Sequence, residues 1–107
     1  MRRAGWAFIN VHAESGRGQI ERDERATQLL HMSRAHEREV APSACVLAGD
    51  FNAREGEDLC LRVEGWRDVF VDNPVAGGAD QEQWTWGRGE YRARYDRVYT
   101  HGTFGAL

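Results

Sequence analysis

Apolar and polar positions alternate first in residues 6–12, W-A-F-I-N-V-H, a stretch of β-branched and aromatic residues without Asp, Glu, Lys or Arg. This pattern predicts a strand. Ala7, Ile9 and Val11 would share one face, while the opposite face becomes polar toward its end at His12. We therefore expect a strand that opens into a site, with His12 either a structural hydrogen-bonding residue or a member of that site.

Residues 19–40 contain no Gly or Pro and are rich in helix formers, which predicts a surface helix with one face on a sheet. Glu21 and Arg25 are spaced to pair on its solvated face. Pro42 ends the helix, because the residue before a proline disfavours helical geometry. The apolar stripe comprises Ile20, Ala26, Leu29, Leu30, Ser33 and His36 or Glu37.

The stretch C-V-L-A-G-D-F-N begins as the short apolar run of a buried strand, which Gly49 interrupts. Asp50 and Asn52 follow on either side of Phe51, and in an extended segment they would point the same way. Polar groups at the end of a core strand cost free energy unless they are paired. The pair therefore indicates either a site that holds a phosphate ester and moves its proton, or an Asx-type turn.

The second half of the chain is less regular. Residues 57–63 predict a short helix, and residues 66–70 predict a buried bend. The polar, glycine-containing residues 72–83 predict a loop. Residues 94–99 alternate charged and apolar side chains, as a half-buried strand does. Between them, the T-W-rich stretch at 84–87 carries aromatic residues that either stack on bases or pin the loop to the core.

Composition fits one packed domain of 107 residues, of which 41% are apolar. The net charge of −3, with both signs interspersed, argues against a protein that coats nucleic acid through phosphate neutralisation, although a single basic cleft is compatible with it. All 14 basic residues are Arg. Cys45 and Cys60 form neither a metal-binding spacing nor a disulfide scaffold. The chain has no long apolar span or signal-peptide core, so we expect an intracellular protein, nuclear or cytoplasmic, without membrane partners.

Several motifs occur in an order that resembles the DNase I-like superfamily of endonucleases, exonucleases and phosphatases, and within it the tyrosyl-DNA phosphodiesterase 2 family. The combination of G-D-x-N with a downstream R-x-D is the most specific part of the resemblance, which covers residues 6 to about 101. The narrower likeness depends on H-x-E-S, E-R-x-x-Q-L and the T-W pair. The motifs are N-V-H-A-E-S at 10–15, A-G-D-F-N at 48–52, W-T-W at 84–86 and R-Y-D-R-V at 94–98.

The resemblance implies an α+β fold, namely a portion of the DNase I-like four-layer α/β/β/α sandwich. Residues 1–107 would form the middle-to-late part of the domain, without its N-terminal strands and its C-terminal segment. The family's metal-binding Glu and its Ser-Asp-His motif would lie outside the chain. We therefore expect an uncovered apolar sheet face, and an isolated chain that is not a competent catalyst.

The resemblance also implies Mg²⁺-assisted hydrolysis of a phosphodiester, with Mn²⁺ as an alternative ion and DNA ends as the substrate. Asp50 would position or deprotonate the attacking water. Asn52 and His12 would hydrogen-bond the phosphate, with Asn52 alternatively bonding the neighbouring carboxylate, and Asp96 would orient the absent histidine. Trp86 and Arg94 would lie near a nucleic-acid groove. Two alternatives stay open: a phosphatase or deadenylase on the same fold, and a non-catalytic, degenerate binding module.

Overall fold

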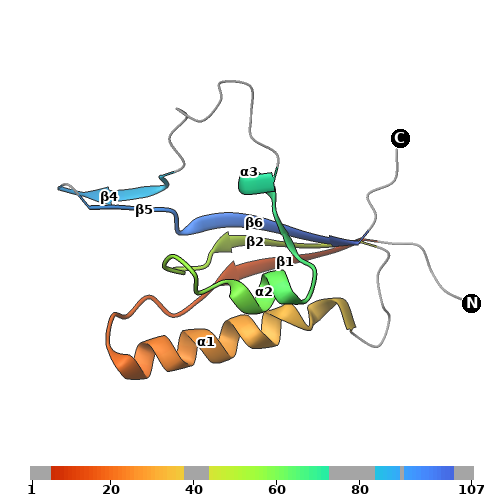
Figure 1. The fold of residues 1–107 in the computed structure, drawn as a ribbon, viewed down its shortest axis with the longest axis horizontal. Helices are drawn as coiled ribbons and strands as arrows, with labels where there is room; N and C mark the ends of the chain where they lie inside the picture. The colour runs from red at the N-terminus through yellow and green to blue at the C-terminus, as the bar shows by residue number, and fades with distance from the viewer. Residues whose placement is uncertain (1–5, 38–43, 73–83, 90, 103–107) are drawn as a thin grey trace, which may run out of the picture.

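The computed structural model of the chain describes residues 6–37, 44–72, 84–89 and 91–102 (Figure 1). Six strands form a four-stranded sheet in the order β1-β2-β6-β3 and a separate β4–β5 hairpin. The elements, in chain order, are β1 (Trp6–His12), α1 (Gln19–Ser33), the 3₁₀ turn η1 (Ala35–Glu37), β2 (Ala44–Asp50), α2 (Leu59–Val63), β3 (Arg67–Asp68), α3 (Val69–Asp72), β4 (Trp86–Arg88), β5 (Tyr91–Ala93) and β6 (Asp96–Gly102).

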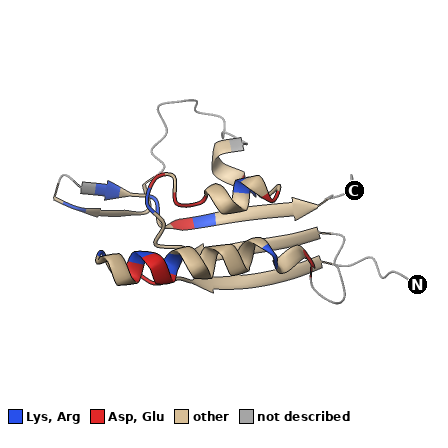
Figure 2. Ribbon diagram, turned by 60° about the horizontal axis from the view of Figure 1, so that its bottom comes forward, with Lys and Arg blue, Asp and Glu red and all other residues tan. Residues whose placement is uncertain are grey.

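The sheet combines a parallel and an antiparallel part. β1 and β2 are parallel, and α1 lies in the crossover connection that neighbouring parallel strands need. β6 runs antiparallel to both β2 and β3. Figure 2 shows charged residues mainly on the helices, the turns and the β4–β5 hairpin, whereas the long strands of the four-stranded sheet are mostly uncharged. The mixed sheet with its helices confirms the α+β fold class predicted from the sequence.

The core lies between one face of the sheet and helices α1 and α2. Leu29 of α1 and Leu61 of α2 pack with strand residues Val11, Leu47 and Tyr99, and all five are buried. Leu47 is in register with Tyr99 and with Ile9, which lies on the same face of β1 as Val11, so these residues share one face of the sheet. For β1 this is the face predicted from the sequence.

The opposite face of the sheet, the uncovered face, exposes large apolar side chains. Trp6, Phe8 and Val98 are 56%, 70% and 41% exposed. The rings of Trp6 and Phe8 lie 5.8 Å apart, so they form a continuous aromatic surface rather than isolated exposed residues. An uncovered apolar face was expected from the resemblance, and the structure confirms it.

The predicted apolar stripe of the first helix is wrong at Ile20, Ala26 and Leu30, which are exposed. The helix ends at Ser33 and continues as η1, while Ile20 and Leu30 are 77% and 55% exposed. The buried stripe consists of Arg25, Leu29 and Ser33, spaced four residues apart. Arg25 is buried because this end of α1 faces polar loops rather than the sheet.

Two shorter predictions also differ from the structure. The short helix begins at Leu59 rather than at residue 57, and the expected bend contains the two-residue strand β3 and the helical turn α3. The prediction for residues 73–83 lies outside the described residues, as does Pro42. None of the helices within the described ranges has the length and apolarity needed to cross a membrane.

Candidate active site

Three predicted catalytic residues lie in one row across the end of the sheet. His12 of β1 is in register with Asp50 of β2, and Asp50 is in register with Asp96 of β6. Residues in direct register point to the same face, with Cβ atoms about 5 Å apart in an antiparallel pair. His12 and Asp96 are exposed and Asp50 is partly buried, so the polar row opens to solvent at the edge of the uncovered face.

Beside this row, β1 and β2 approach so closely that position 49 of β2 has no room for a side chain. Gly49 does not end the strand, as its position after the apolar run suggests, because β2 continues to Asp50. Its φ of 139° and a Cβ that would lie 2.2 Å from the Val11 carbonyl oxygen restrict the position to glycine. Gly49 thus permits the close approach of β1 and β2 next to His12 and Asp50.

The prediction that Asp50 and Asn52 point the same way from an extended segment is wrong. Asn52 has a left-handed φ of 49°, and its backbone N–H donates to Asp50 Oδ1 at 3.0 Å. This is the Asx-type turn that the sequence left as an alternative. The buried Asn52 amide donates to the Ala13 carbonyl at 2.8 Å, so Asn52 ties the end of β2 to the loop after β1.

The other members of the row have no such structural bond. Within the described part of the chain, the His12 ring and the Asp96 carboxylate have no hydrogen-bond partner. The structural hydrogen bond offered as the alternative role of His12 is not seen among the described residues, and a role of His12 in a site stays a prediction. Asp96 is instead positioned through its backbone, since its N–H and that of Tyr95 both donate to Thr85 Oγ1, at 3.0 and 2.9 Å.

The two predicted substrate-binding residues lie beside the row, on the hairpin and the segment that precedes β6. Trp86 is 38% exposed, and its ring lies 5.8 Å from that of Tyr95. Arg94 Nη2 lies 2.6 Å from Oδ2 of the fully buried Asp68, and its side chain is only 13% exposed. Arg94 is therefore committed to a buried ion pair, whereas Trp86 is pinned to the core and still offers part of its ring.

The sequence did not reveal an ionic network that supports the loops around the row. Arg25 Nε and Nη2 donate to the two Glu57 carboxylate oxygens, at 2.8 and 3.1 Å. Arg25 Nη1 donates to the carbonyls of Glu14 and Gly16, each at 2.9 Å. Burial opposes ionisation of Glu57, but the hydrogen bonds from Arg25 and Arg54 outweigh it and lower the pKa of Glu57.

A second buried cluster supports β6 from the helical face. Tyr99 donates from its hydroxyl to Asp58 Oδ2 at 2.7 Å, and Arg97 Nη1 donates to the Tyr99 oxygen at 2.9 Å. Burial raises the pKa of Tyr99, so it stays a neutral donor. Burial opposes ionisation of Asp58, yet the hydrogen bond from Tyr99 and the charge of Arg62 lower its pKa. The only sequence signal for this cluster was the alternation of charged and apolar residues in 94–99, which contains both Arg97 and Tyr99.

A cleft of about 820 Å³ lies next to the hairpin and α2. Arginines and aromatic rings line much of it, with few acidic side chains. Arg54 donates to the carbonyls of Asn52 and Ser15, and its guanidinium lies 5.2 Å from the centre of the Tyr95 ring. The basic and aromatic lining residues are Arg54, Arg62, Arg92, Arg94, Arg97, Trp84 and Tyr95.

Solved structures of tyrosyl-DNA phosphodiesterase 2 (TDP2) are similar to this chain in fold. A humanized D. rerio TDP2 has 22% identity and a TM-score of 0.69, and D. rerio TDP2 complexed with single strand DNA product has 23% and 0.68. TDP2 from C. elegans has 23% identity and a TM-score of 0.58. The chain has the fold of part of TDP2. No protein-family model and no curated protein matches it.

The likeness to TDP2 covers nearly all of this chain but a minority of the longer proteins. The matches span 94% of the chain and 41–42% of the D. rerio structures, and 90% of the chain and 32% of the C. elegans TDP2. This confirms the partial DNase I-like fold expected from the motifs. The likeness shows the fold alone, and the roles expected of His12, Asp50, Asn52 and Asp96 stay predictions.

Proposed function

We propose that this chain carries part of the active site of a Mg²⁺-dependent phosphodiester hydrolase that acts on tyrosyl–DNA ends. The observation that carries the proposal is the register of His12, Asp50 and Asp96 across three adjacent strands. Two carboxylates in direct register repel one another, which is unfavourable unless a cation or a proton lies between or beside them. The row therefore has the composition of a catalytic site rather than of a packing site.

The residues of the row divide the chemistry among them. Asp50, held at the strand end by the Asx turn, would position or deprotonate the attacking water. His12 would donate to a phosphate oxygen from the next strand. Asn52 would hold the Asp50 carboxylate through its backbone N–H, since its buried amide donates to the Ala13 carbonyl. Asp96 would orient a histidine that the resemblance places outside this chain.

The donor set at the row also fits the ion that the fold implies. Asp50 and Asp96 supply carboxylate oxygens, which Mg²⁺ and Mn²⁺ prefer over nitrogen or sulfur ligands. A bound divalent ion would stabilise negative charge that develops on the phosphate. Because the resemblance implies that the family's metal-binding Glu lies outside these residues, we propose that the 107 residues form one part of a complete site and do not turn over substrate alone.

DNA as the substrate is supported by the basic, aromatic cleft and by the TDP2 structure that contains a single-strand DNA product. An arginine guanidinium can bind a phosphate through two N–H groups at once, and exposed aromatic rings can stack on bases. Trp84 is 52% exposed at this cleft, which leaves much of its ring available for a base. A DNA substrate would place the protein in the nucleus or cytoplasm.

The test is a substrate panel with the longest reading frame that contains these residues in its gene. We expect Mg²⁺-dependent release of tyrosine from a 5′-tyrosyl oligonucleotide, with little activity on sugar phosphates, inositol phosphates or poly(A). A preference for any of those substrates would favour the phosphatase or deadenylase alternative. DNA binding without metal-dependent hydrolysis of any substrate would favour the binding module.

A further inference from the structure

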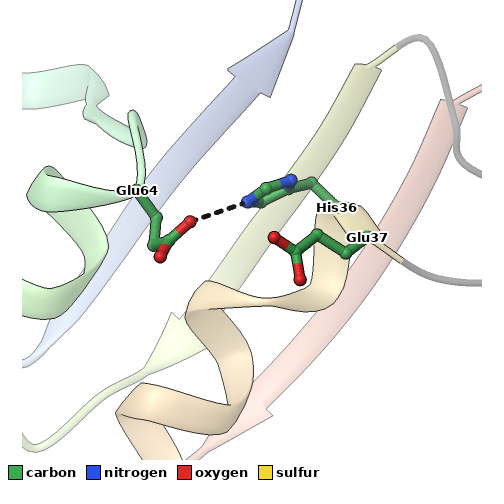
Figure 3. A group of neighbouring side chains, drawn as sticks. All are labelled: His36, Glu37 and Glu64. Atoms are coloured by element: carbon green, nitrogen blue, oxygen red, sulfur yellow. Dashed lines mark ion pairs between the residues drawn. The ribbon is translucent and has the colours of Figure 1, made fainter.

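A second group of metal-ligand side chains lies far from the row. His36 and Glu37 of η1 converge with Glu64, the residue that follows α2 (Figure 3). One ligand atom from each residue lies within 4.8 Å of the other two. The side chains of His36, Glu37 and Glu64 are 18%, 49% and 27% exposed, so the group is open to a small ion from solvent.

The ring nitrogen at the centre of this group has no hydrogen-bond partner. His36 Nε2 is the buried side-chain nitrogen or oxygen that lacks one among the described residues. Buried polar atoms are rarely left unpaired, so this atom calls for an unseen partner such as a water or an ion. Figure 3 marks the contact of His36 Nε2 with the Glu64 carboxylate as an ion pair, but at 3.5 Å the two atoms do not form a hydrogen bond.

The His36 ring is held in this orientation by other aromatic residues. It stacks on His101, with ring centres 3.9 Å apart and planes at 2°. His101 is itself fixed, because its Nε2 lies 2.9 Å from the Glu64 carbonyl oxygen and its ring packs against Trp66. His101 therefore holds the His36 ring by stacking on it and holds the Glu64 backbone by its contact with the carbonyl oxygen. Glu64 is the residue whose carboxylate faces His36.

The separation of the two atoms matches two ligands of one tetrahedral ion. Zinc binds imidazole nitrogen at about 2.0–2.1 Å and carboxylate oxygen at about 2.0–2.2 Å, so two such ligands at a tetrahedral angle lie roughly 3.4 Å apart. His36 Nε2 and Glu64 Oε2 are 3.5 Å apart. We propose that His36, Glu37 and Glu64 bind a first-row transition ion of the Zn²⁺ type, with water as a fourth ligand.

This site is distinct from the proposed Mg²⁺ site at the row. An imidazole ligand favours Zn²⁺ over Mg²⁺ or Ca²⁺. His101 beneath the site and Asp96 in the row are separated by about 17 Å along β6. A bound ion would link the end of η1 to the loop after α2 and hold these elements together over the sheet.

Arg34 is the competitor for the carboxylates. Its guanidinium lies 3.3 Å from a Glu37 oxygen and 3.5 Å from a Glu64 oxygen, and its side chain is 58% exposed. Such exposed contacts contribute little free energy, so an ion can displace the side chain. Removing its charge with Arg34→Gln should consequently tighten metal binding.

Calorimetric titration of the 107-residue chain with Zn²⁺, alone and in variants, tests the proposal. We expect one saturable site whose affinity falls at least tenfold in His36→Gln and in Glu64→Gln. His31→Gln, at an exposed position on α1, serves as the matched control and should bind as the wild type does. The Co²⁺-loaded chain should show a four-coordinate visible spectrum without a thiolate charge-transfer band, which excludes Cys60 as a ligand.

The substitutions at the exposed residues Glu37 and Arg34 test the proposal even if the variants of the more buried His36 and Glu64 fail to fold. Glu37→Gln should weaken Zn²⁺ binding and Arg34→Gln should strengthen it, while circular dichroism stays unchanged. Zn²⁺ should also raise the melting temperature of the wild type but not of His36→Gln. Absence of Zn²⁺ binding by the wild type, or equal affinity in Glu37→Gln, Arg34→Gln and the wild type, would overturn the proposal.

Discussion

Asp50 and Asp96 lie in direct register on the antiparallel strands β2 and β6. Like charges in this position destabilise a sheet by about 0.2–1 kcal/mol relative to a neutral pair. The fold tolerates this repulsion at the point where the sheet presents its most polar row. Such a cost is typical of sites that are shaped by binding or catalysis rather than by stability.

The first prediction concerns this repulsion. Asp96→Asn should raise the free energy of unfolding of the metal-free chain by about 0.2–1 kcal/mol, because it removes one of the two facing charges. Urea denaturation monitored by circular dichroism measures the change. Asp23→Asn, on the exposed surface of α1, is the control and should leave stability unchanged. A loss of stability in Asp96→Asn would show that the two carboxylates are not in conflict.

The second prediction concerns the buried Arg25. Arg25→Met should lower the free energy of unfolding by about 3–5 kcal/mol, because the Glu57 carboxylate and two carbonyls lose their donor. Arg22→Met, one turn earlier and exposed, provides the matched control. Equal denaturation midpoints for the two variants would mean that the ion pair contributes nothing to the loops behind the row.

The third prediction concerns acid. The pKa values of Glu57 and Asp58 are lowered in the folded chain, so the unfolded chain binds more protons as the pH falls through the usual carboxylate range. The contribution of these two carboxylates to the free energy of unfolding should be fully present at neutral pH and should be lost as the pH falls below about 4. Urea midpoints across this range measure the effect, and Asp58→Asn should show a shallower decrease. An identical pH profile for Asp58→Asn would contradict the assignment.

The fourth prediction concerns the uncovered face. The chain should self-associate as its concentration rises, because Trp6 and Phe8 present a contiguous aromatic surface. Sedimentation velocity should show less association for Phe8→Ser. Ile20→Ser removes an equally exposed apolar residue from α1 and should have no effect. Association that responds equally to both substitutions would point to non-specific aggregation.

The fifth prediction concerns DNA. Trp84→Ala should weaken binding of a single-stranded oligonucleotide by about 1–3 kcal/mol, the free energy of one base–aromatic stack. Fluorescence anisotropy measures the affinity, with Trp6→Ala on the uncovered face as the control. Equal affinities in the two variants would remove the cleft from the binding surface.

Local patterns predicted the parts of the fold that depend on neighbouring residues. The pattern in 6–12 identified β1 and its buried face, and polar residues at strand ends pointed to His12 and Asp50, whereas Asp96 came from the family resemblance alone. The row itself could not be read from sequence spacing, because its register joins three strands over 84 positions. The resemblance brought those residues together only by analogy.

Features that depend on distant partners were missed. Arg25 has the surroundings of a solvated helix residue in the sequence, and its partner Glu57 lies 32 positions away. Asn52 has a positive φ, and its side chain bonds the Ala13 carbonyl 39 positions away, a contact that no local pattern contains. Likewise, the buried ion pair of Arg94 with Asp68 was invisible in a strand that simply alternates charged and apolar residues.

The most direct test of the central claim is the turnover of a 5′-tyrosyl oligonucleotide in Mg²⁺ by the complete reading frame and by its Asp50→Asn variant. The isosteric amide keeps the Asx turn but cannot deprotonate water, so we expect at least about a hundredfold loss of rate with unchanged DNA affinity. Wild-type turnover in Asp50→Asn, with the fold intact, would contradict the role given to the row.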